Sequence, residues 1–93
     1  MQFDFSTRQG KDAIARHLQS VAVASGLCSE YYAKITWANE SGSVYLTLPG
    51  HKIRVGDHGA CYGCSISVDP EGLTVEQAEA WIRQTAEDEA EEA

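Results

Sequence analysis

The sequence lacks the features that would place the protein in a membrane or outside the cell. No apolar run approaches the roughly 20 residues that a membrane-spanning helix needs. Residues 1–5 have neither the basic start nor the apolar stretch of a signal peptide. Cysteine is scarce, with three residues, an odd number that does not indicate a disulfide framework. We therefore expect a cytoplasmic protein.

Basic residues are few as well. Seven Lys and Arg residues face 14 Asp and Glu residues, which gives a formal net charge of −7. Proteins that bind nucleic acid directly usually carry a basic patch, so we expect no direct nucleic-acid partner and no membrane partner. The oligomeric state does not follow from these counts.

A catalytic constellation is also lacking. Asp57 and His58 could form an acid–base pair, with Cys61 three residues further on. A nucleophile, a base and an orienting group are recognised by their geometry, which the sequence does not supply. The alternative is that the Asp57 side chain bonds backbone amides of its own loop. We expect a protein that is not an enzyme.

The length and composition are those of one small globular domain. A chain of 93 residues, of which 43% are hydrophobic, has room for one core. Only residues 87–93 are of low complexity. We expect a single α+β domain over residues 1–86, followed by a disordered acidic tail over residues 87–93.

The first segment with helical periodicity precedes residue 26. Ile14, Leu18 and Val21 recur at the spacing of one helix face. Gly26 suits the position just after a helix, where a left-handed conformation is common. Ser6 and Thr7 are candidates for the N-cap of this helix, but because glycine is a weak helix former, Gly10 could delay its start to about Lys11.

The middle of the chain has the alternating pattern of strands. The period is two from residue 31 to residue 55, with turns at 39–43 and 49–50. Shorter strands are predicted at residues 2–5 and 65–68. The expected fold is an antiparallel meander of four to five strands, with one buried and one wet face. An N-terminal and a C-terminal helix pack on it.

The last helix begins with a capping box, in which Thr74 is the N-cap and Gln77 lies three residues later. An apolar stripe follows, formed by Ala78, Trp81, Ile82 and Thr85. Glu76 and Glu79 lie opposite that stripe, where we expect them to face water. The acids further on rotate onto the apolar side, so the helix should either lose its packing near Ala86 or project past the body into water.

The acidic residues are concentrated at the end of the chain. Residues 1–68 hold five acids and six bases, for a net charge of +1, whereas residues 69–93 hold nine acids and one base, for a net charge of −8. This asymmetry predicts that the acidic end meets a basic protein surface. The alternative is that these charges only keep the protein soluble. The candidate partner-binding residues are Glu76, Glu79, Glu87, Asp88 and Glu89.

A glycine-rich loop holds the sharpest local motif. Cys61 and Cys64 form a Cys-x-x-Cys pair, whose thiolates can converge on a metal. Structural zinc needs four ligands, so two more would have to come from Cys28, His51 and His58. The alternative hypothesis is therefore a zinc-binding accessory module that uses Cys61, Cys64, His58 and Cys28. Otherwise we expect no cofactor, and the cysteines pack as small hydrophobic residues.

The outward positions of the central strands combine aromatic and basic residues. Such a face could stack single-stranded nucleic acid, or a helix could cover part of it and water the remainder. The residues are Tyr32, Lys34, Thr36, Tyr45, Thr47, Lys52 and Arg54.

The segment from Lys52 to His58 resembles a strand-then-turn motif of short accessory proteins from phages and other mobile elements. The length, the acidity and the lack of a catalytic constellation are similar to those of anti-CRISPR proteins. This resemblance implies an inhibitor that binds a CRISPR–Cas effector of the host cell. It would block DNA binding or nuclease recruitment, in part by presenting DNA-like acidity.

Overall fold

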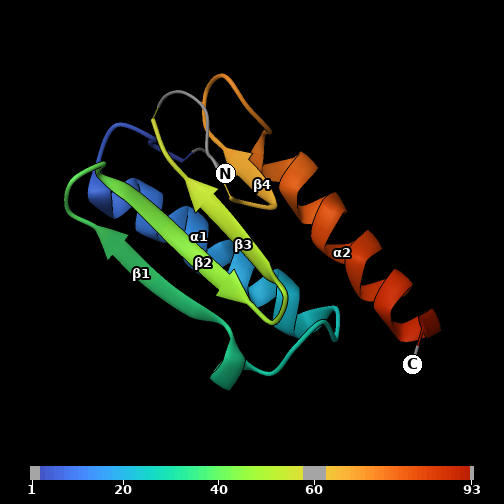
Figure 1. Ribbon diagram of the computed structural model, residues 1–93. Helices are drawn as coiled ribbons and strands as arrows, with labels where there is room; N and C mark the ends of the chain where they lie inside the picture. The colour runs from blue at the N-terminus through green and yellow to red at the C-terminus, as the bar shows by residue number, and fades with distance from the viewer. Residues whose placement is uncertain (1–2, 58–62, 93) are drawn as a thin grey trace.

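The computed structural model describes residues 3–57 and 63–92. They form the expected α+β fold, with a four-stranded sheet and a helix towards each end of the chain (Figure 1). The elements in chain order are α1 (Arg8–Ala24), a short 3-10 helix η1 (Glu30–Tyr32), β1 (Lys34–Ala38), β2 (Ser43–Leu48), β3 (His51–Val55), β4 (Ile66–Val68) and α2 (Val75–Glu92).

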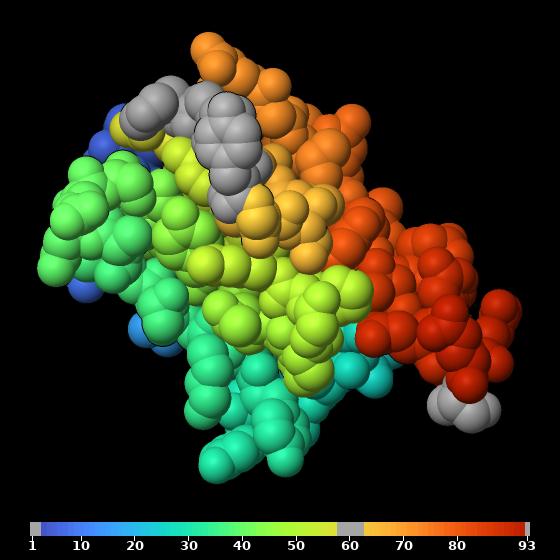
Figure 2. Space-filling view, viewed as in Figure 1, coloured from blue at the N-terminus to red at the C-terminus, as the bar shows by residue number. Residues whose placement is uncertain are grey.

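Two layers make up the fold. The strands lie in the order β1-β2-β3-β4, and α1 crosses behind them in Figure 1. Helix α1 packs chiefly on β2, and α2 packs on α1 and on β4. The core lies between the sheet and the helices, and its largest fully buried side chains are Ile14, Leu18, Leu46, Ile53 and Ile82. The opposite face of the sheet points towards the viewer in Figures 1 and 2.

The sheet is mixed, which corrects the predicted antiparallel meander. Strands β1, β2 and β3 are antiparallel to their neighbours as expected, but β4 runs parallel to β3. The reason lies in the connection over residues 56–65, which is longer than the roughly two to five residues of a hairpin loop. A longer connection can lead the chain back to the end of the sheet where β3 begins, so that the next strand runs parallel to β3. A tight hairpin, by contrast, forces an antiparallel strand.

The N-terminal segment is not the predicted strand. Phe3 and Phe5 are half-buried and pack against the core without sheet pairing. A Cβ atom at Gly10 would lie 1.7 Å from the Asp4 carbonyl oxygen, so glycine permits this segment to cross the helix closely. Helix α1 therefore includes Gly10. It begins at Arg8 because the Thr7 hydroxyl accepts a 2.9 Å hydrogen bond from the Gly10 amide.

The end of α1 is as predicted. Gly26 has a φ of +83°, the left-handed conformation that glycine adopts without strain. Its amide donates to the Val23 carbonyl oxygen, and the Leu27 amide donates to that of Ala22, which is the Schellman pattern. Among the described residues, no helix is long and apolar enough to cross a membrane.

Candidate binding surface on helix α2

Helix α2 begins as its sequence predicts. The Thr74 amide donates to the Gln77 side-chain oxygen at 2.9 Å, and the Gln77 amide donates to the Thr74 hydroxyl at 3.1 Å. These two bonds satisfy amides that a helix start otherwise leaves unpaired. The buried stripe is narrower than predicted, since Trp81 and Thr85 are only half-buried. It consists of Val75, Ala78, Ile82 and Ala86.

The helix does not end near Ala86. It continues to Glu92, so residues 87–92 extend α2 instead of forming the expected disordered tail. Glutamate and alanine are strong helix formers, and this stretch contains neither glycine nor proline. The last turns project beyond the rest of the molecule, as the red atoms in Figure 2 show.

Glu79 does not face water as predicted. Its side chain is 19% exposed, because it lies against α1. The Glu79 Oε1 atom is 2.8 Å from Nε2 of His17 and 3.8 Å from Nη2 of Arg83. A carboxylate that already has these partners on its own chain has less capacity to contact another protein.

Glu89 also faces the body of the protein. Its carboxylate lies 3.6 Å from Nε2 of His51 on β3, and the His51 ring meets the Trp81 ring edge to face at 5.3 Å. Nearby, burial raises the pKa of the Cys28 thiol, and the negative charge of Glu89 raises it further. Because 47% of the Glu89 side chain is still exposed, Glu89 contacts both the body of the protein and the solvent.

The remaining acids of α2 point into solvent. They are exposed, and within residues 3–57 and 63–92 only Asp88 among them accepts a hydrogen bond from a side chain, that of Gln84 at 3.0 Å. Residues four apart on a helix have Cβ atoms about 6 Å from one another, so the carboxylates of residues 87–92 sit close together, whereas Glu76 lies about three turns before them. We name this surface the outer acidic face; it consists of Glu76, Glu87, Asp88, Glu91 and Glu92.

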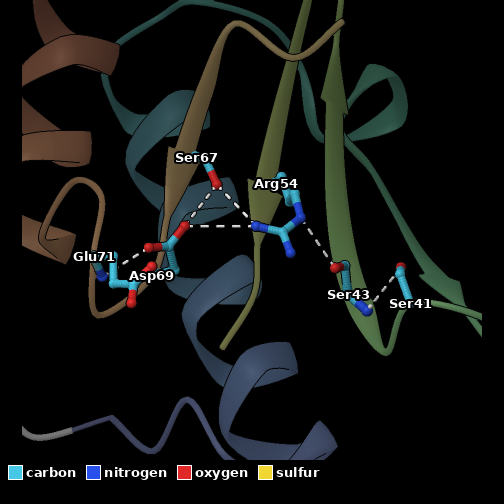
Figure 3. A network of polar contacts seen from close by, with 6 residues as sticks. All are labelled: Ser41, Ser43, Arg54, Ser67, Asp69 and Glu71. Carbon is cyan, nitrogen blue, oxygen red and sulfur yellow. Dashed lines mark hydrogen bonds and ion pairs between the residues drawn. The ribbon is translucent and has the colours of Figure 1, made fainter. Parts of the chain in front are cut away.

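A buried polar network supports the start of α2 (Figure 3). Arg54 is 6% exposed and Asp69 is 4% exposed, and their charged groups approach to 3.5 Å. The Arg54 guanidinium also donates to the hydroxyls of Ser43 and Ser67 at 3.1 Å each. The second Asp69 oxygen accepts a 2.8 Å hydrogen bond from the Glu71 amide. The network therefore ties strands β2, β3 and β4 to the turn that leads into α2.

The predicted zinc ligands are only partly within the described residues. His58 and Cys61 lie outside them, so only Asp57 of the predicted acid–base pair is among the described residues. Cys64 is disulfide-bonded, whereas Cys28 is a free, half-buried thiol. A disulfide sulfur is not the thiolate that binds zinc. The zinc hypothesis stays a prediction, and zinc analysis of the reduced, purified protein tests it.

The predicted aromatic–basic face is partly assembled. Lys34, Thr36, Thr47 and Lys52 are exposed on the sheet, but Arg54 is buried in the network described above. Tyr32 belongs to η1 and not to a strand. The Lys52 ammonium lies 4.6 Å from the centre of the Tyr45 ring, so this lysine covers the ring that would stack a base.

Comparisons with protein-family models, with curated proteins and with solved structures find no match to this chain.

Proposed function

We propose that the protein binds a positively charged surface of another protein through the outer acidic face of α2. The observation that supports this most is the helix itself, which continues to Glu92 and carries its exposed carboxylates beyond the body of the domain. A disordered tail would have to lose conformational entropy on binding. A helix that is already formed avoids much of that cost.

The docking of α2 supports the same proposal. Val75, Ala78 and Ile82 bury the inner side of the helix, and the contacts of Glu79 and Glu89 with two histidines hold it at both ends. The outer carboxylates are thereby carried on a scaffold of fixed orientation. Charge complementarity of this kind steers encounter and sets specificity more than it adds affinity.

The partner class that fits best is a protein complex that handles nucleic acid. Arginine side chains that bind phosphate also bind carboxylate, because both present paired anionic oxygens. The outer acidic face would then occupy a groove built for DNA. Together with the resemblance to anti-CRISPR proteins, this leads us to propose a CRISPR–Cas effector as the target. Occupation of that groove would block DNA binding or nuclease recruitment.

Two matched triple variants test this proposal. The first replaces Glu87, Glu91 and Glu92 with glutamine, and the control replaces three exposed acids outside α2, Glu30, Glu40 and Glu71, with glutamine. Both variants change the net charge equally. Each should be titrated against purified CRISPR–Cas effector complexes at several salt concentrations, with target-DNA cleavage measured in parallel.

We expect the α2 variant to bind between about threefold and a hundredfold more weakly, as the loss of three exposed ion pairs predicts. Its affinity should also depend less on salt. The control should stay within about twofold of the parent protein. Equal affinities of the two variants would refute a specific role of the outer acidic face.

A further inference from the structure

Strand β1 is a free edge of the sheet. Among the described residues it pairs only with β2, in an unbroken register from Lys34↔Thr47 to Ala38↔Ser43. An edge strand presents a row of backbone N–H and C=O groups that another strand can pair with. Proteins often block such an edge with proline, a bulge or an inward-pointing charge. Strand β1 has no proline or bulge, the residues that point inward are Ile35 and Trp37, and the one charged residue on it is Lys34 at its start.

A groove runs beside this edge, on the helix side of the sheet. Because α1 packs chiefly on β2, it leaves Ile35 and Trp37 half-exposed. The groove has a volume of about 120 Å³ and adjoins a wider hollow of about 410 Å³ along α1. Its lining residues are Arg8, Asp12, Ile35, Thr36, Trp37 and Val44.

The charges beside the groove and on the strand are mainly positive. The Arg8 guanidinium stacks over the Trp37 ring at 4.5 Å, and Lys34 is exposed at the start of the strand. Arg16 is 70% exposed and forms a 2.6 Å ion pair with Asp12. These four residues carry a net charge of +2 on a chain whose net charge is −7. Glu30 and Glu40, in the segments that flank the strand, bring the sum for all six residues to zero, so the excess positive charge is confined to the groove and the strand itself.

From the free edge, the groove and the local charge, we infer that β1 binds an extended acidic peptide of a partner protein as a fifth strand of the sheet. Backbone hydrogen bonds to the edge supply affinity, and alternate side chains supply specificity. One set of side chains enters the groove beside Arg8 and Trp37. The other set lies over the open face of the sheet, where Lys34 can pair with a carboxylate.

This inference goes beyond the proposed function, because it assigns a second surface. Strand β1 and helix α2 lie at opposite sides of the molecule in Figure 1, so the two surfaces can be tested separately. A second copy of the chain could also pair along β1. Each copy, however, carries a net charge of −7 and would bring the same arginines to the same groove, so an acidic peptide is the better complement.

The test uses a fluorescein-labelled six-residue peptide of alternating glutamate and valine, whose binding is followed by fluorescence anisotropy. A lysine–valine peptide tests the charge preference. A third peptide carries N-methyl groups on alternate residues and is made in two versions, one for each edge of the extended peptide. In one version the methylated amides are those that face β1. Because this version loses two or three backbone hydrogen bonds, it should bind at least about tenfold more weakly.

Two protein variants complete the design. Arg8→Glu places an acid at the first residue of α1, where the helix dipole favours it, so the variant should fold. We expect it to bind the acidic peptide about fivefold more weakly. Lys52→Glu makes the same charge change on β3, away from the edge, and should stay within about twofold. The glutamine variant of α2 should bind the peptide as the parent protein does.

Three results would overturn the inference. The first is that both N-methylated peptides bind as tightly as the parent peptide. The second is that the protein binds the lysine–valine peptide as tightly as the glutamate–valine peptide. The third is that sedimentation shows a dimer of the protein, which Arg8→Glu dissociates. The last result would identify a second copy as the occupant of the edge. None of these results depends on the outer acidic face, so failure here leaves the proposed function unaffected.

Discussion

The buried pair of Arg54 and Asp69 gives the sharpest prediction about stability. Replacing Asp69 with asparagine keeps the shape of the side chain but removes one negative charge beside a buried guanidinium. Removal of one partner from a buried ion pair typically costs about 3–5 kcal/mol. Here the two charged groups are 3.5 Å apart, which is longer than the roughly 2.8 Å of a strong charge-assisted bond. Arg54 also keeps its bonds to Ser43 and Ser67.

We therefore expect Asp69→Asn to lower the free energy of unfolding by about 2–3 kcal/mol. A domain of this size has about 5–14 kcal/mol in total, so the variant should fold but melt about 10–20 °C lower. Urea unfolding followed by the fluorescence of Trp37 and Trp81 measures the change. Glu71→Gln, at an exposed neighbouring acid, should change the free energy by less than about 0.5 kcal/mol. A loss below about 0.5 kcal/mol in Asp69→Asn would refute the view that this network holds the strands to the start of α2.

Two further predictions concern the inner side of α2. Glu79→Gln should lower the free energy of unfolding by about 1 kcal/mol, because it weakens the contact with His17. Glu76→Gln, on the outer acidic face, should leave the free energy of unfolding nearly unchanged. Equal urea midpoints of the two variants would contradict the prediction. Because its pKa is raised by burial and by Glu89, the Cys28 thiol should react more slowly with iodoacetamide at pH 7.5 than a free cysteine does, and faster as the pH rises. Glu89→Gln should speed this reaction at pH 7.5, and an unchanged rate, with the modified residue located by mass spectrometry, would count against the proximity of the two groups.

Local patterns predicted the elements whose signals are local. The capping box of Thr74 and Gln77, the glycine that ends α1 and the antiparallel strands β1 to β3 are all confirmed. The wet face was predicted too broadly, because Ser43 and Arg54 on it are buried. In each case, the residues that form the bond or share the face lie close together in the sequence. The parallel pairing of β4 and the irregular path of Phe3 and Phe5 were missed, because each depends on contacts with residues far along the chain.

For the candidate surface on α2 too, local features were predictable and long-range contacts were not. Charge and helical period are properties of the local chain, so the sequence predicted the concentration of acids after residue 68 and the place of Glu76 and Glu79 on a helix. It did not predict that the helix continues through residues 87–92. Which carboxylates are available to a partner depends on contacts between elements far apart in the chain. His17 meets Glu79 across 62 residues of sequence, and His51 meets Glu89 from β3. The helical period gives the direction in which each acid points from the axis of α2. The packing of α1 and the sheet against α2 decides whether protein or water lies in that direction.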